Sequence, residues 1–414
     1  MEGGKSGNSH FFHYHYLPRI EVMGLDNFTQ GWYNVAMSVK GLKKGFKYRI
    51  YPTKSQERLL RKTLDAARWV YNETLKTRKE TWEQRKEYLS LYTTNKLLTG
   101  WKRERPFLTA AYSQVLEDAQ ERVDLALKAF FRRVKAGEKP GYPRFRGEGR
   151  YNSITYPQFG FKLKDNCLFL SKIGTIKAVL HRPIEGKIKT CTISQTATGD
   201  WYVCFSCEIE PESLPAEQKA VGVDVGIESF ATLSTGEKIP SPRFFHKNEK
   251  ALAKAQRRLS NAKKGTSGRA KRRRVVAKTY KRIVNRRADF AHKLSRHLVN
   301  EYGIIVFENL DIKRMLRNHG FAKNISDAAW GQLVRYTTYK AEWAGRKCIL
   351  VNPQNTSKMC SRCGTLVEKE LSVRVHSCLC CGLVLDRDEN AAINILRLGL
   401  QSVGIQSVEA YLLH

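Results

Sequence analysis

Hydrophobic positions recur at two different spacings in the first half of the chain. A strand-like segment at 46–51 leads into Thr53 and Gln56, which fit a capping box and predict the start of a helix. Helical periodicity continues to about residue 133, and short alternating segments separated by Gly, Pro and Asp follow from 151 to 209. These patterns predict a small β-barrel with a helical block inserted into it or set beside it.

The second half of the chain has the pattern of an α/β fold. Three apolar segments predict buried strands: VGVDVGIESF, FATLS and, after a long helical stretch, GIIVFENL. A Cys-rich ribbon and a short helix at 389–400 end the chain. Residues 1–40, by contrast, mix Gly, His and aromatic side chains without periodicity. We expect a poorly ordered extension there, and Met37 fits an alternative start.

The amino-acid composition indicates what kind of partner the protein binds. The 414 residues include 73 Lys and Arg against 39 Asp and Glu, a formal net charge of +34. A compact protein so basic repels itself unless a polyanion neutralises it, which indicates nucleic acid or an anionic membrane. No apolar run approaches the ~18–20 residues that span a bilayer, and the N-terminus lacks a signal-peptide pattern. We therefore expect a cytoplasmic protein without a membrane partner.

The positive charge is concentrated between Lys247 and Arg287, where seventeen Lys or Arg accompany one acid, Glu249. Apolar spacing predicts two helices in this stretch, broken near Gly265. A solvated helix face usually carries mixed charges in i,i+4 pairs, whereas these cations have almost no partners, so we expect them to bind a phosphate backbone. The residues predicted to bind nucleic acid here are Arg257, Arg258, Lys271, Arg272, Arg273, Arg274, Lys278 and Arg282.

Cysteines near the C-terminus have the spacing of a metal site. Cys360 and Cys363 form one CxxC pair followed by glycine, and Cys378 and Cys381 form a second. Only the pair of Cys378 and Cys381 repeats the two-residue gap of the first pair, so we predict that Cys380 is not a metal ligand. Two such turns complete a tetrahedral set of four thiolates, which predicts a structural Zn²⁺ because no position stays open for chemistry.

Two strands each carry a candidate catalytic acid. Asp224 lies inside an apolar strand, on the face that it shares with Gly222 and Gly226. A charge buried there is costly unless it is paired or bound to metal, and we expect the two glycines to leave open space around it. Glu308 ends a second apolar strand, which is where sites collect in open α/β sheets.

The third acid follows the cysteines. If Asp386 is the N-cap of the last helix, Glu389 completes a capping box and Asp388 lies on the small apolar face that packs on the sheet. We therefore predict that Asp386 caps the helix and Asp388 points inward. Together, Asp224, Glu308 and Asp388 suit a pair of Mg²⁺ or Mn²⁺ ions that would activate water for phosphodiester hydrolysis.

In their order, these motifs resemble the TnpB (OrfB) family of insertion-sequence proteins, which are related to the compact type V CRISPR nucleases. The matching segments are FKYRIYPTKSQ, RWVYN, GYPRFR, GVDVGIESFATLS, IVFENLDI and NTSKMCSRCG…CCGLVLDRDENAAINI. The resemblance implies an RNase H-like RuvC nuclease domain with Asp224, Glu308 and Asp388 as catalytic residues, and a zinc ribbon with four cysteine ligands. It also implies a guide RNA from the transposon end and double-stranded target DNA cut beside a short recognised motif.

The resemblance gives a role to each part of a multidomain chain that we expect to be monomeric in its ribonucleoprotein. A wedge-like β-barrel would comprise 41–54 and 141–215, with a helical recognition insertion at 55–140. The expected parts that follow are the RuvC-like domain at 216–355, the zinc ribbon at 356–384, the third-motif helix at 385–400 and a tail at 401–414. In the wedge and its insertion, the expected nucleic-acid contacts are Lys47, Tyr48, Arg49, Arg68, Asn72 and Arg144.

Four other functions fit the sequence less well. A nuclease-inactive, RNA-guided repressor would be expected to lose an active-site acid, and all three are present. A guide-independent RuvC-type resolvase would leave the long segment before residue 216 and the basic stretch without a role. A plain zinc-ribbon DNA-binding protein would not need the three acids. A transposase of the single-strand type would need a His-hydrophobic-His motif with a downstream Tyr nucleophile, and we find no such combination.

Overall fold

The structure is a computed structural model and describes residues 42–210, 214–215, 217–317, 319–370 and 373–405. The predicted extension at 1–40 and most of the predicted tail at 401–414 lie outside the described residues. None of the described helices is both long enough and apolar enough to cross a membrane.

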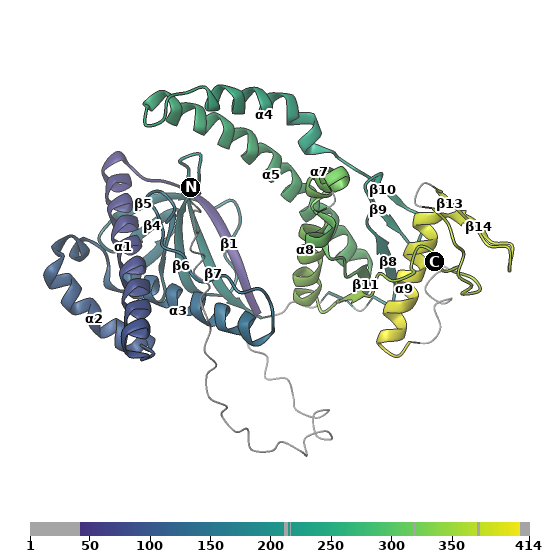
Figure 1. Cartoon of the computed structure of the whole chain (residues 1–414), viewed down its shortest axis with the longest axis horizontal. Coiled ribbons are helices and arrows are strands. Elements are labelled where there is room, and N and C mark those ends of the chain that lie inside the picture. Colours follow the sequence, from purple (N-terminus) through teal and green to yellow (C-terminus); the bar gives the residue numbers. More distant parts are fainter. Residues whose placement is uncertain (1–41, 211–213, 216, 318, 371–372, 406–414) are drawn as a thin grey trace, which may run out of the picture. The chain divides into compact units, whose positions relative to one another are not determined.

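A seven-stranded antiparallel sheet, curled into a nearly closed barrel, forms the first folded part (Figure 1). The strands are hydrogen-bonded in the order β2-β6-β7-β1-β5-β4-β3. Burial alternates along β7, as expected for strands with one face toward a core. The strands are β1 Leu42–Tyr51, β2 Ser153–Tyr156, β3 Phe161–Lys164, β4 Cys167–Leu170, β5 Gly174–Val179, β6 Lys187–Gln195 and β7 Trp201–Ile209.

A helical block is inserted between β1 and β2, which decides between the two arrangements that the sequence left open. It contains α1 Lys54–Arg85, α2 Leu91–Glu104, a 3-10 turn at Pro106–Ala110 and α3 Ser113–Lys135. The predicted capping box is confirmed, because Thr53 accepts from the Gln56 backbone while the Gln56 side chain accepts from the Thr53 backbone. Inside the block, Arg78 on α1 and Asp124 on α3 form a buried ion pair 2.9 Å long.

A five-stranded sheet forms the second folded part, in the order β10-β9-β8-β11-β12. Its strands are β8 Ala220–Asp224, β9 Ser229–Leu233, β10 Lys238–Pro240, β11 Ile304–Glu308 and β12 Lys347–Val351. β8, β11 and β12 are parallel, whereas β9 and β10 are antiparallel to their neighbours. The three predicted strands are present, and β12 was not predicted.

Helices cover both faces of this five-stranded sheet. On one face, Val221 and Val223 pack with residues of α5 Ser267–Glu301 and α8 Trp330–Trp343. On the other face, Ala220 and Val306 pack with α9 Arg387–Ser402. The remaining elements are α4 Phe244–Ser260, α6 Ile312–Met315, α7 His319–Ala328 and the hairpin of β13 Val375–Ser377 with β14 Val384–Asp386.

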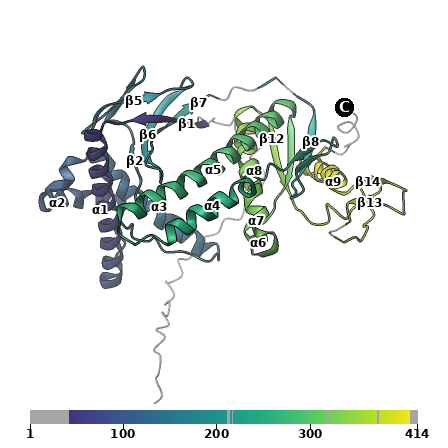
Figure 2. The same cartoon turned by 90° about the horizontal axis from the view of Figure 1, so that it is seen from above.

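The basic stretch forms two helices, as predicted. α4 ends at Ser260 and α5 begins at Ser267, where Thr266 caps the new helix by accepting from the backbone N–H of Arg269. The two helices lie side by side (Figure 2). The sequence break near Gly265 therefore corresponds to the turn of a helical hairpin.

Candidate active site

The three predicted acids lie on two neighbouring strands of the five-stranded sheet and on a helix that packs against these strands. Asp224 ends β8 and Glu308 ends β11, and these strands are parallel neighbours in which Phe307 pairs with Val223. The two acids therefore follow adjacent residues at the same end of the sheet. Asp388 lies in the first turn of α9, which packs against β8 and β11 (Figure 1).

The environment of Asp224 and Glu308 disfavours negative charge. Burial, followed by the charges of Glu308 and Asp388, raises the pKa of Asp224 to about 8, and Arg387 opposes this shift. Burial also raises the pKa of Glu308, and a hydrogen bond from Thr356 opposes it. Carboxyl groups that share a poorly solvated site repel each other when ionised, and both shifts have the direction that this repulsion and burial cause.

The acids differ from the cysteines in how tightly they are gathered. Within the described ranges, Cys360, Cys363, Cys378 and Cys381 form the only group of three or more His, Cys, Asp or Glu whose ligand atoms all lie within 4.8 Å of one another. Asp388 is held by its neighbour, because Nε and Nη2 of Arg387 donate to Oδ1 of Asp388 at 3.1 and 3.0 Å. The acids offer the oxygen ligands that Mg²⁺ and Mn²⁺ prefer.

The N-cap of α9 is the predicted Asp386, but only the half of the predicted capping box that its own side chain supplies is present. Oδ1 of Asp386 accepts from the backbone N–H groups of Asp388 and Glu389 at 3.0 and 3.2 Å. Its other oxygen forms an ion pair with Lys238 at 2.6 Å. Asp386 is thus occupied as a cap, while Ala391 and Ala392 on the same helix are fully buried.

The prediction that glycine leaves open space beside Asp224 is wrong for Gly222. A Cβ at this position would lie 2.7 Å from the backbone nitrogen of Leu396 and closer still to the carbonyl oxygen of Ala392. Gly222 therefore allows the backbone of α9 to touch β8. Because glycine has no side chain, the helix that carries Asp388 can pack directly on the strand. The space beside Gly222 is therefore filled by α9 and is not a metal cavity.

The four predicted thiols converge as expected. Sγ of Cys360 lies 3.6 Å from Sγ of Cys381, and Sγ of Cys363 lies 3.5 Å from Sγ of Cys378. The glycine after each pair has a positive φ, 75° at Gly364 and 73° at Gly382, which lets the backbone turn. Cys380, predicted to be spare, is exposed.

Side chains that the sequence did not indicate join the ribbon to α9. Asn390 and Asn394 are fully buried. Asn390 accepts from the backbone N–H of Ser361 at 2.9 Å, and both asparagines donate to the carbonyl oxygen of Met359. The sequence pattern places these two asparagines with Asp386 and Glu389 on the polar face of α9. The signal that could have found them is their i,i+4 spacing, which puts both on one face of the helix.

The predicted nucleic-acid residues on the basic helices are all exposed: Arg257, Arg258, Lys271, Arg272, Arg273, Arg274, Lys278 and Arg282. The expectation that cations in this stretch lack partners is wrong at two positions. Lys281 pairs with Asp200 at 2.5 Å, and Arg287 pairs with Asp327 at 2.7 Å. Asp200 lies far before the basic stretch in the sequence, and Asp327 lies well beyond its end. A local pattern could therefore not reveal these partners.

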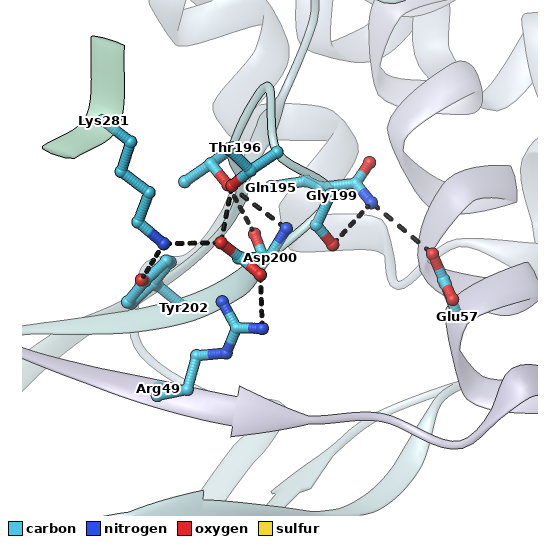
Figure 3. A network of polar contacts seen from close by, with 9 residues as sticks. Arg49, Glu57, Gln195, Thr196, Gly199, Asp200, Tyr202 and Lys281 are labelled. Carbon is cyan, nitrogen blue, oxygen red and sulfur yellow. Dashed lines mark hydrogen bonds and ion pairs between the residues drawn. The ribbon is translucent and has the colours of Figure 1, made fainter. Parts of the chain in front are cut away.

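Asp200 is the centre of a polar network that includes β1, the turn after β6 and α5 (Figure 3). Its carboxylate accepts from Arg49 at 2.6 Å, from Lys281 at 2.5 Å and from the Thr198 hydroxyl at 2.5 Å. The hydrogen bond from Arg49 is the largest of several effects that hold the pKa of Asp200 well below its usual range. The ring of Tyr202 lies beneath the same two cations.

The residues of the barrel and its insertion that were predicted to contact nucleic acid differ in their exposure and in their partners. Tyr48 does not fit the prediction, because its side chain is 1% exposed and its hydroxyl donates to the carbonyl oxygen of Arg182. Asn72 is engaged with the backbone of Arg146 through both its oxygen and its nitrogen. Arg49 is paired with Asp200, and Arg68 is half-buried beside Asp65. Lys47 and Arg144 are exposed.

Comparisons with known families place this architecture in a class. A model described as "Probable transposase" matches residues 204–319, and a Cas12f1-like TNB domain model matches 330–395. A helix-turn-helix model matches 37–87, where the structure has β1 and the single helix α1. The family models thus describe a transposase-related protein whose C-terminal part, which contains the four cysteines, is similar to a Cas12f1-like TNB domain.

Individual relatives give the family. A protein of Streptomyces pristinaespiralis named "Putative RNA-guided DNA endonuclease" is 39% identical over 367 residues, 87% of this chain and 90% of that protein. "Putative RNA-guided DNA endonuclease InsQ" of Escherichia coli K12 is 31% identical over 378 residues, 86% and 92% of the two chains. This chain belongs to the TnpB (OrfB) family of insertion-sequence proteins.

The fold is also similar to a solved structure. Cas12f1 in a complex with sgRNA and target DNA matches with a TM-score of 0.54 at 15% sequence identity, over 86% of this chain and 98% of that one. At this identity, the similarity concerns the fold.

Proposed function

We propose that this chain is an RNA-guided, metal-dependent DNA endonuclease encoded by a transposon. The observation that carries the proposal is the position of Asp224, Glu308 and Asp388 at one end of the sheet. The charges of Glu308 and Asp388 contribute to the raised pKa of Asp224. Relatives that align over nearly the whole chain are named RNA-guided DNA endonucleases, and this supports both the nuclease activity and the guide.

Different parts of the structure hold the acids in position. Adjacent parallel strands fix the spacing of Asp224 and Glu308, and the capped first turn of α9 orients Asp388. Arg387 neutralises part of the charge of Asp388 until a cation binds. Two Mg²⁺ or Mn²⁺ ions held by these carboxylates would supply an activated water and stabilise the leaving 3′ oxygen of the cut strand.

We assign the five-stranded sheet and its helices, 216–355 and 385–400, to an RNase H-like RuvC nuclease domain. A strand order in which antiparallel strands on one side adjoin parallel strands on the other supports this assignment. The cysteines at 356–384 suit Zn²⁺, because four thiolates leave no open coordination position. The barrel, 41–54 and 141–215, would act as the wedge, and the helices at 55–140 as the recognition insertion.

Guide RNA and double-stranded target DNA are the proposed partners of a monomeric ribonucleoprotein. The exposed cations of α4 and α5, together with Lys47 and Arg144, provide the phosphate-binding surface. A guide-independent resolvase is not favoured, because the relatives also match the segment before the nuclease domain. A nuclease-inactive repressor is not favoured either, since all three acids are present.

The test starts from the protein expressed with its native locus. The RNA that co-purifies is sequenced, and a plasmid library with the matching target beside randomised bases is incubated with the complex and Mg²⁺. We expect cleavage of plasmids that share a short motif, and loss of cleavage in Asp224→Asn. Asp165→Asn, in an exposed turn where the residue has a φ of 52° that asparagine tolerates, is the matched control.

Two outcomes would contradict the proposal in different ways. Purification without any specific RNA would contradict guidance by RNA. Cleavage by Asp224→Asn at the wild-type rate would contradict the assignment of the active site.

A further inference from the structure

Thr356 lies between β12 and the first cysteine pair, and its side chain contacts one of the proposed catalytic acids. The residue is 2% exposed. Its hydroxyl donates to Oε1 of Glu308 and lies 3.2 Å from the carbonyl oxygen of Pro353. Since a hydroxyl has one proton and the carboxylate is the stronger acceptor, we assign the proton to the bond with Glu308.

The backbone of Thr356 contacts the helix that carries another of these acids. Its carbonyl oxygen accepts from Nδ2 of Asn394 at 2.9 Å, and Asn394 lies on α9, six residues after Asp388. Asn394 is fully buried and also donates to the carbonyl oxygen of Met359 at 2.6 Å. One buried threonine is therefore bonded to β11 through its side chain and to α9 through its backbone.

We propose that Thr356 is a positioning residue that holds the carboxylate of Glu308 for metal binding and fixes it relative to α9. A hydrogen bond to one oxygen restricts rotation of the Glu308 carboxyl group and leaves its other oxygen for a cation. Carboxylates that bind metals are in general oriented by such bonds, and removal of the partner typically lowers metal affinity or activity about 10–100-fold. The inference rests on the proposed function, because it requires Glu308 to act in catalysis.

The alternative is that Thr356 only fills space in a buried loop. That role depends on the volume of the side chain and not on the hydroxyl group. Valine has nearly the same shape as threonine but no hydroxyl, whereas serine keeps the hydroxyl and loses the methyl group. The two substitutions therefore separate positioning from packing.

The experiment uses the full chain with its co-purified guide RNA and a matching DNA target at saturating concentration. Mn²⁺ binding to the complex without target DNA is measured by electron paramagnetic resonance for Thr356→Val and Thr356→Ser. The cleavage rate of the same variants is measured across a range of Mg²⁺ concentrations. We expect Thr356→Val to raise the Mg²⁺ concentration for half-maximal cleavage about ten-fold, and Thr356→Ser to restore it to within about two-fold of the wild-type value.

Thr337→Val is the matched control for replacing a buried threonine. Thr337 is fully buried in α8, and its hydroxyl donates to the carbonyl oxygen of Leu333 in the same helix at 3.1 Å. We expect this control to keep the wild-type Mg²⁺ dependence. If Thr356→Val fails to fold, Thr356→Ala and Thr356→Ser form a second pair that differs only in the hydroxyl.

The outcomes distinguish failure of this inference from failure of the proposed function. Equal Mg²⁺ dependence in Thr356→Val and Thr337→Val, or in Thr356→Ala and Thr356→Ser, would overturn the positioning role. Cleavage by Glu308→Gln at the wild-type rate would overturn the role of Glu308 in catalysis, whatever the Thr356 variants do. Loss of cleavage in Glu308→Gln together with unchanged Thr356 variants would overturn the inference alone.

Discussion

The Cα of Gly222 on β8 faces the carbonyl oxygen of Ala392 on α9 so closely that no Cβ fits between the two backbones. This contact joins the strand of Asp224 to the helix of Asp388. We expect Gly222→Ala to push α9 away from the sheet and to lower the free energy of unfolding by about 1–3 kcal/mol or more, since an added methyl group in a packed core forces the backbone to shift.

The measurement for this prediction is urea unfolding together with the rate of DNA cleavage. Gly100→Ala in α2 is the control, because a Cβ at Gly100 would meet nothing within 4 Å. The control should be neutral or slightly stabilising, as alanine is a better helix former than glycine. Equal stability of the Gly222→Ala protein and the control would contradict the close approach.

The cysteine ribbon gives a second prediction. We expect about one zinc per chain in the purified protein and loss of this zinc in Cys363→Ser, because three thiolates and a hydroxyl form a weaker site. Cys380→Ser should retain zinc, since Cys380 is exposed and apart from the cluster. Elemental analysis measures the metal content, and loss of zinc in both variants would contradict the assignment of ligands.

The network around Asp200 predicts a change in RNA binding. In Asp200→Asn, Arg49 and Lys281 lose the carboxylate that they share. If both cations then bind phosphate, the slope of log affinity against log salt concentration should become steeper by about 1.4 on single-stranded RNA, about 0.7 for each cation. Filter binding at several salt concentrations measures the slope.

The control for Asp200→Asn is Asp165→Asn, which changes the net charge equally in an exposed turn. The same slope in both variants would show that Arg49 and Lys281 do not reach the RNA when released.

Lys340 gives a prediction about pH. It is 5% exposed, and its Nζ donates to the carbonyl oxygen of His292 and to the hydroxyl of Ser295 at 2.6 and 2.7 Å. Burial, followed by the charge of Arg296, lowers the pKa of Lys340 to about 8, whereas an unfolded lysine has a pKa of about 10.4. Below pH ~8, the folded protein therefore holds a charged group that water would solvate better.

The sign of the effect follows from proton binding. Between pH ~8 and ~10.4, the unfolded chain keeps the lysine proton that the folded chain has lost, so this group makes the free energy of unfolding rise with pH. Relative to Lys340→Met, the wild-type protein should gain on the order of 1–3 kcal/mol between pH ~7 and pH ~10. Urea unfolding of both proteins at each pH measures the difference, and a difference that is constant with pH would contradict the prediction.

Local patterns in the sequence were sufficient to predict many elements of this protein. The capping box at Thr53, the two basic helices, the strands that end at Asp224 and Glu308 and the cap at Asp386 were all predictable. They depend on side chains a few residues apart, and periodicity reports such neighbours directly. The set of four converging cysteines was predictable for the same reason, because each CxxC turn is local.

Only the tertiary structure decided the contacts between residues far apart in sequence. The pairing of β12 with β11 and the ion pair of Lys281 with Asp200 are of this kind. Gly222 shows the difference most clearly. Its sequence neighbours favoured an open cavity, but the space belongs to α9, which follows more than 160 residues later. Which backbone fills the space beside a glycine depends on the packing of the whole domain, and no local pattern of residues determines it.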